Sequence, residues 1–241
     1  MKTRHQQILN ITFIGVFAAL SYIVLAILFI PFANMYIHFG NLVVVLAALL
    51  VGGWQGGLAG SIGMGFFDIF NGHIDSSPKT FLLKFLIGLT VGLVFKFLSS
   101  KKSFPFISLL VSGIASLAVS ASLLIYMITK TGAYAGKSAY LFPLFLIIGI
   151  ALIVFSAFSS KLPHSTACAA IAACAGMAIN VIGETIWKVV TYVIEGSAVQ
   201  AAFISAALGQ ASTLINAGIA IIGGVALYEA LKKPFSKILS K

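Results

Sequence analysis

The sequence predicts an all-α protein, a polytopic transmembrane helical bundle that forms one integral membrane domain over residues 1–241. Hydrophobic residues make up 60% of the chain and charged residues only 8%, whereas a soluble domain carries about 25% charged residues. Long apolar runs alternate with short interruptions rich in Gly, Pro, Ser and Lys. The basic residues lie mainly at the ends of these runs, as the positive-inside rule expects.

Eight apolar segments follow one another along the chain: 8–30, 41–51, 56–70, 80–98, 104–128, 140–158, 166–194 and 200–230. The first is too long for a signal-peptide core and no small-x-small cleavage site follows it, so we expect a retained helix. The second and third are too short to cross roughly 30 Å of hydrocarbon upright. Because the glycine-rich link 52–57 separates them with hardly any loop, six or seven full spans with a re-entrant pair remain an alternative.

The basic residues predict a multi-pass protein of the cell membrane with both termini in the cytoplasm. In the eight-segment topology the outer loops hold only Lys79, Lys130 and Lys137, and Lys84 and Lys188 lie within the membrane. The cytoplasmic ends hold the other ten: Lys2, Arg4, Lys96, Lys101, Lys102, Lys161, Lys232, Lys233, Lys237 and Lys241. This asymmetry explains the net charge of +10 without a nucleic-acid partner.

Two ionisable residues, Glu184 and Lys188, lie four positions apart inside the apolar segment 166–194. An ionisable side chain inside a bilayer costs a few kcal/mol or more and is a functional-site hypothesis by default. The spacing allows the two side chains to meet on one helix face, with the acid before the base. The alternative is an ion pair that only fixes this helix against its neighbours.

Further polar residues fall in the same predicted depth range, towards the outer side, and come from several segments. They are Asn34, Tyr36, His38, Asn41, Asp68, His73, Lys84, Gln210 and Asn216, beside Glu184 and Lys188. Because polar groups in lipid must be paired or face a cavity, we expect one cavity open to the outside. Trp187, Tyr192 and Phe67 would form its aromatic walls. Separate roles remain as alternatives, such as snorkelling of Lys84 or interhelical hydrogen bonds from Gln210 and Asn216.

No catalytic chemistry is predicted. The sequence holds no GxxxxGK[ST], GxSxG or HExxH motif, so neither a P-loop ATPase nor these hydrolase classes are expected. His38 and His73 lack the further ligands of a metal site, and Cys168 and Cys174 are interpreted as small packing residues. We expect no enzyme activity, cofactor or metal.

A family resemblance rests on several stretches. Residues 11–20, with Gly15 and Ala19 four apart, resemble the first helix of substrate-binding S components of energy-coupling factor (ECF) transporters, which carries a small-xxx-small pattern. Residues 39–69 look like the short second and third helices of the riboflavin/pyridoxine-type group, and residues 80–89, with Lys84, like its fourth. Residues 175–230 resemble its last two helices. The six-helix S component leaves 104–158 unmatched, so we expect an inserted helical hairpin within a core of residues 8–98 and 166–230.

The resemblance implies a substrate-capture subunit of an ECF-type importer that binds a water-soluble vitamin or precursor from outside. Its implied partners are the lipid bilayer, a transmembrane coupling subunit that docks at Gly15 and Ala19, and two ATPase subunits. The implied substrate-binding residues are Lys84, Asn180, Glu184, Trp187, Lys188, Tyr192, Gln210 and Asn216. The implied gating-loop residues are His38, Asn41, Asp68 and His73.

The candidate substrates are heteroaromatic compounds with hydroxyl groups, because aromatic side chains lie beside an acid and two bases. Within the resembling group, pyridoxine or another B6 form comes first, then a hydroxymethylpyrimidine precursor and riboflavin. The first alternative function is a stand-alone, proton-coupled secondary transporter that uses Glu184 or Asp68 as its titrating carboxylate. The second is a membrane enzyme or a structural membrane protein.

Overall fold

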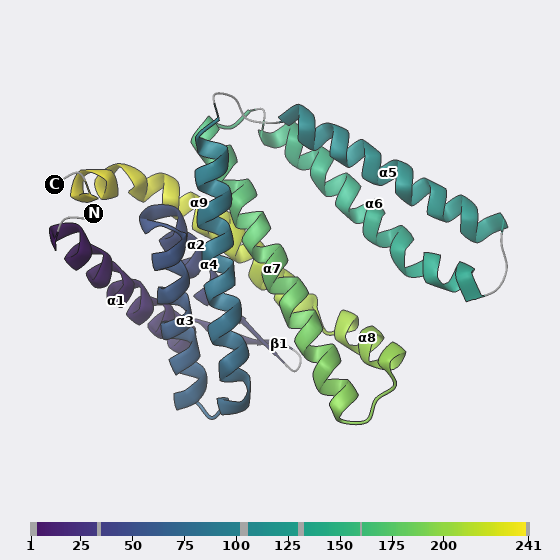
Figure 1. The fold of residues 1–241 in the computed structure, drawn as a ribbon, viewed down its shortest axis with the longest axis horizontal. Helices are drawn as coiled ribbons and strands as arrows, with labels where there is room; N and C mark the ends of the chain where they lie inside the picture. The colour runs from purple at the N-terminus through teal and green to yellow at the C-terminus, as the bar shows by residue number, and fades with distance from the viewer. Residues whose placement is uncertain (1–3, 33–34, 102–105, 130–132, 160, 240–241) are drawn as a thin grey trace. The chain divides into compact units, whose positions relative to one another are not determined.

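The computed structural model describes residues 4–32, 35–101, 106–129, 133–159 and 161–239. The described residues form nine α-helices, one two-stranded sheet and a 3₁₀ turn, η1 (Figure 1). In chain order the elements are α1 (Arg4–Ile27), β1 (Phe29–Phe32), β2 (Met35–His38), α2 (Gly40–Val51), α3 (Gly53–Phe70), η1 (Ile74–Ser76), α4 (Ser77–Ser99), α5 (Phe106–Thr129), α6 (Ala133–Ser159), α7 (His164–Ile194), α8 (Val199–Leu208) and α9 (Ala211–Leu239). Lys2, Asn34, Lys102, Lys130, Lys241 and the first residues of the segment 104–128 lie outside the described residues.

The predicted all-α, polytopic membrane fold is confirmed. Within the described residues, five helices are long and apolar enough to cross a membrane. They run over Arg4–Ile27, Ile74–Ser99, Leu109–Tyr126, His164–Ile194 and Ala211–Ile238. The chain is therefore a multi-pass membrane protein.

Two local predictions were wrong. The expected segment 200–230 is two helices, because α8 ends at Leu208 and α9 begins at Ala211. The first segment, expected over 8–30, ends as a helix at Ile27, and an antiparallel hairpin follows in which Phe29 pairs with His38 and Phe32 with Met35.

The chain divides into two compact units, one of residues 1–100 and 168–241 and the other of residues 101–167. Helices α5 and α6 pack along each other in the second unit, where the Ser156 hydroxyl donates to the Phe106 carbonyl at 2.8 Å. A Cβ at Gly113 would lie 3.1 Å from the Gly149 carbonyl oxygen, so the two helices approach closely there. The second unit corresponds in sequence to the expected hairpin 104–158, whose status as an insertion stays a prediction.

Helices α2 and α3 form the short pair that the sequence indicated. Gly52, with φ of 108°, separates them, and this left-handed backbone suits a residue without a Cβ. A Cβ at Gly56 would lie 2.4 Å from the Ala48 backbone nitrogen, so the two helices pack nearly backbone to backbone. Val44 and Val45 in α2 are fully buried. A helix too short to span a membrane is thus surrounded by protein.

Glycines also bring α3 against α4. A Cβ at Gly88 would lie 2.3 Å from the backbone nitrogen of Gly57, and one at Gly92 would lie 2.2 Å from that of Gly53. On each helix the two glycines are four residues apart, which is the small-xxx-small spacing of close helix pairs in membranes. This contact positions the N-terminal half of α4, which carries Lys79, Thr80 and Lys84.

Candidate functional site

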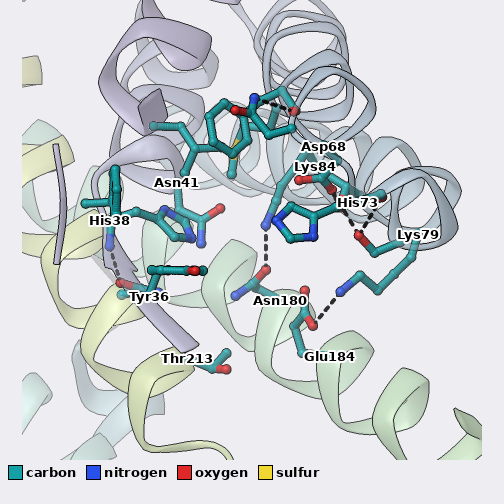
Figure 2. A pocket seen from close by; sticks show the side chains of 18 of the residues that line it. Tyr36, His38, Asn41, Asp68, His73, Lys79, Lys84, Asn180, Glu184 and Thr213 are labelled. Carbon is teal, nitrogen blue, oxygen red and sulfur yellow. Dashed lines mark hydrogen bonds and ion pairs between the residues drawn. The ribbon is translucent and has the colours of Figure 1, made fainter. Parts of the chain in front are cut away.

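A cavity of about 520 Å³ lies within the first compact unit (Figure 2). Its volume is within the usual range of small-molecule sites, about 300–1,000 Å³. Side chains from α1, the β-hairpin, α2, α3, the loop around η1, α4, α7 and α9 line it. Of the twelve residues predicted as substrate-binding or gating, eight line this cavity: His38, Asn41, Asp68, His73, Lys84, Asn180, Glu184 and Asn216. Tyr36 and Phe67, also expected in the cavity, line it too.

The deepest charged group of the cavity is Lys84 on α4. Its side chain is 5% exposed, and its ammonium donates a hydrogen bond to the Asn180 Oδ1 of α7 at 3.1 Å (Figure 2). An ammonium has three donors, so two N–H groups remain available beyond the Asn180 contact. Asn180 is 2% exposed, and its helix therefore holds the acceptor in a fixed position.

The Glu184 carboxylate forms an ion pair that the sequence did not predict. Lys79 in the first turns of α4 donates to Glu184 Oε2 at 2.9 Å, and both side chains are about 15% exposed. Lys188, the partner expected from helical spacing, donates to the Gly209 carbonyl oxygen at 2.7 Å. The partner of Glu184 is thus a lysine of another helix, α4. The i,i+4 spacing within α7 cannot predict such a tertiary contact.

Asp68 at the end of α3 accepts a hydrogen bond from the Thr80 hydroxyl, and the Ser76 hydroxyl, whose nearer acceptor is the His73 carbonyl oxygen at 3.0 Å, also lies close to this carboxylate. The Thr80 hydroxyl lies 2.5 Å from Asp68 Oδ2, and the Ser76 hydroxyl lies 3.4 Å from the same oxygen. Hydroxyl groups of η1 and α4 thus connect the C-terminal end of α3 to the start of α4. The imidazole of His73, which is exposed, lies at the same side of the cavity.

Asn216 of α9 attaches the β-hairpin to the helices. Its Oδ1 accepts from the His38 backbone N–H at 2.9 Å, and its Nδ2 donates to the Tyr36 carbonyl oxygen at 3.0 Å. One amide thus satisfies a donor and an acceptor on the outer edge of β2, as a neighbouring strand would. The hairpin is held where it covers the cavity.

His38 is expected to make stability pH-dependent. Burial, with a smaller contribution from the Lys84 ammonium, lowers the pKa of His38 to about 3, from its ordinary value near 6.5. Between these values the unfolded chain binds the proton and the folded chain does not. The stabilisation is therefore complete above about pH 6.5 and is lost as the pH falls towards 3.

The check is the melting temperature in detergent between pH 7.5 and pH 5, compared with a His38→Gln variant. We expect the wild type to lose more stability than the variant over this interval. Parallel curves for the two proteins would contradict this pKa.

Four predicted residues do not line the described cavity: Trp187, Lys188, Tyr192 and Gln210. Trp187 is 39% exposed. Gln210 Nε2 donates to the Thr185 hydroxyl at 2.9 Å, which is the interhelical role left open by the sequence. A substrate contact by any of these four residues stays a prediction.

Lys79, Thr80 and Thr213 all line the cavity, although the sequence did not indicate them as site residues. Lys79 was counted only as an outer-loop cation, although it lies five residues before Lys84, near the same end of the predicted helix. Thr80 and Thr213 gave no signal, because threonines are common in apolar helices. Among the described residues, no three His, Cys, Asp or Glu side chains gather closely enough to hold a metal ion.

The residues expected to dock a partner, Gly15 and Ala19, are exposed on α1. A Cβ at Gly15 would meet no atom within 4 Å, so packing inside the described protein does not require a glycine there. Ala19 also lines an apolar groove between α1 and α3, together with Tyr22, Ile62 and Phe66.

Comparison with known families identifies the chain. The family described as ECF-type riboflavin transporter, S component, matches residues 5–157, which is more than half of the 241 residues. The matched range runs from α1 to α6. Comparisons with curated proteins and with solved structures find no match. The chain therefore belongs to the S-component family of ECF-type transporters, as a membrane subunit that binds a vitamin-type substrate.

Proposed function

We propose that this protein captures a water-soluble vitamin or vitamin precursor from the extracellular side, in the cavity beneath the β-hairpin. The observation that carries the proposal is the convergence of buried polar groups from α2, α4, α7 and α9 on one cavity. Tight small-ligand sites combine a few such groups with apolar walls. Here Leu25, Met64 and Phe67 supply apolar wall.

Two residues, Lys84 and Glu184, would make the strongest contacts. Lys84 would donate to an acceptor on the ligand, while Asn180 orients the ammonium. Glu184 would accept from a ligand hydroxyl or N–H while Lys79 balances its charge. Among the aromatic side chains that line the cavity, Phe29, Tyr36 and Phe67 are available to contact a ring.

The substrate would be a heteroaromatic compound with hydroxyl groups. Pyridoxine or another B6 form is our first candidate, followed by a hydroxymethylpyrimidine precursor and riboflavin, the vitamin in the description of the matching family. Each offers a ring to the aromatic walls and hydroxyl groups to Lys84 and Glu184.

Uptake would require partners, because the chain carries no P-loop for ATP hydrolysis. We propose a transmembrane coupling subunit that docks at Gly15 and Ala19 of α1, and two ATPases that act through it. Two small residues four apart allow a second helix to approach closely. Both termini would then lie in the cytoplasm and the β-hairpin outside.

Native mass spectrometry of the detergent-purified protein, with a thermal-shift panel of the three candidate vitamins, tests the proposal. We expect one bound vitamin per chain and a higher melting temperature in its presence. Glu184→Gln is expected to weaken this binding, because it removes the charge of a cavity acceptor. The matched control Glu195→Gln makes the same chemical change at an exposed carboxylate that does not line the cavity, and should leave binding nearly unchanged.

An empty protein that no vitamin stabilises would contradict capture and favour the proton-coupled carrier. A strong effect of a further variant, Lys188→Met, with none of Glu184→Gln would move the site towards α8.

A further inference from the structure

A buried acceptor without a partner marks one side of the cavity. Asn41, at the start of α2, is 1% exposed and lines the cavity. Its Oδ1 has no hydrogen-bond partner among the described residues. Buried polar groups are nearly always hydrogen-bonded, so an exception points to a group that completes its bonds on binding something else.

The neighbouring His38 has a fixed arrangement of donor and acceptor. The Gly40 backbone N–H donates to His38 Nδ1 at 3.3 Å, so Nδ1 carries the lone pair. A neutral imidazole holds one proton, and that proton therefore lies on Nε2. His38 also lines the cavity, from the strand that Asn216 holds in place (Figure 2).

The two groups have opposite hydrogen-bonding character and come from one short segment. His38 is the last residue of β2, and Asn41 is the second residue of α2. A Cβ at Gly40 would lie 2.9 Å from the Met64 Cε, so the turn between them packs tightly against α3. The His38 end of this segment is also held by its backbone N–H, which donates to Asn216 Oδ1 of α9 at 2.9 Å, so its position does not depend on a ligand.

We propose that His38 and Asn41 determine the specificity of the site. They would select a ligand that carries a hydrogen-bond donor next to an acceptor. The ligand donor would bond to Asn41 Oδ1, and the ligand acceptor would receive the His38 Nε2–H. A lactam, an amidine edge or an aromatic hydroxyl has this chemistry, whereas a ring edge with acceptors alone does not. This inference rests on the proposed function, because it assigns the ligand class of the same cavity.

The role of Asn41 as an acceptor is tested with pairs of ligands that differ in one hydrogen-bond donor. Riboflavin is compared with N3-methylriboflavin, and pyridoxine with 3-O-methylpyridoxine, by calorimetric titration of wild type and Asn41→Leu. For the vitamin that binds, we expect methylation to weaken wild-type binding about 10- to 100-fold, the range of a lost hydrogen bond to a buried group. In Asn41→Leu the parent and methylated ligands should bind almost equally.

The control is Thr213→Val, a change of similar shape in another side chain that lines the same cavity. It should leave the ratio between parent and methylated ligand unchanged. A ratio that persists in Asn41→Leu would overturn the assignment, because the methyl group would then clash elsewhere. The role of His38 as a donor is tested separately. His38→Leu should weaken binding of the parent vitamin about tenfold, whereas His38→Gln, which keeps an N–H, should retain most of the wild-type affinity.

Two measurements without ligand separate this inference from the proposed function. Asn41→Leu should keep or raise the melting temperature, because it removes a buried acceptor that lacks a partner; a clear drop would overturn the role of Asn41. Nitrogen-15 spectra of histidine-labelled protein, assigned with His38→Gln, should show a neutral His38 with its proton on Nε2 at pH 6. A proton on Nδ1, or an imidazolium, would overturn the role of His38 even if a vitamin binds.

Discussion

Replacing Lys84 with methionine is expected to weaken vitamin binding about 10- to 100-fold while the protein stays folded. A hydrogen bond from a charged group contributes about 1.5–3 kcal/mol, which corresponds to this range of affinities. Lys84 is 5% exposed, and the one acceptor that it contacts among the described residues is Asn180. Methionine has similar length and fills the space without a charge, so the cost of burying an ammonium disappears.

Calorimetric titration with the bound vitamin, and the melting temperature without it, measure the two effects of Lys84→Met separately. Lower affinity with an equal or higher melting temperature would show that the buried charge serves the ligand. Unchanged affinity together with a lower melting temperature would contradict this, and would make Lys84 a structural link between α4 and α7. The comparison variant Lys79→Met leaves the Glu184 carboxylate without its cation and should destabilise the unliganded protein.

Gly88→Ala is expected to destabilise the protein strongly, by about 1–3 kcal/mol or more, because one added methyl group overpacks a rigid contact. That methyl carbon would lie 2.3 Å from the Gly57 nitrogen and 2.4 Å from its Cα. Both are backbone atoms, so α3 and α4 must separate. This movement would also displace Lys84, which lies one turn before Gly88 on α4.

The matched control is Gly218→Ala on α9, where an added Cβ meets no atom within 4 Å. Alanine is favoured over glycine inside a helix by about 1 kcal/mol, so this variant should be equally or more stable. The measurement is the melting temperature of both variants in the same detergent. Equal melting temperatures would show that the contact between α3 and α4 is looser than the glycine positions indicate.

The helices were largely predictable because each apolar run is bounded by residues that end helices or carry charge. The break between α8 and α9 was not, since Gly209 and Gln210 lie inside a continuous apolar stretch. Both residues form hydrogen bonds with α7. The Lys188 ammonium donates to the Gly209 carbonyl oxygen, and the Gln210 side chain donates to the Thr185 hydroxyl. These partners are distant in sequence, and no local pattern reveals them.

The sequence predicted many of the residues of the candidate site, but not which of them contact one another. An ionisable residue in an apolar run is conspicuous, so Glu184 and Lys84 were identified from the sequence alone. The partner of Glu184 is Lys79, 105 residues away in the chain. The pairing depends on how α4 lies against α7, where a Cβ at Gly176 of α7 would lie 3.2 Å from the Ile87 carbonyl oxygen of α4.

The charged side chains that line the cavity balance one another. Lys79 and Lys84 carry two positive formal charges, and Asp68 and Glu184 carry two negative ones. Such a chamber exerts little long-range attraction on an ion, so ionic strength should hardly alter the association rate even of a charged form of the vitamin. Recognition would then begin at contact distance, and the external salt concentration would set neither its speed nor its selectivity.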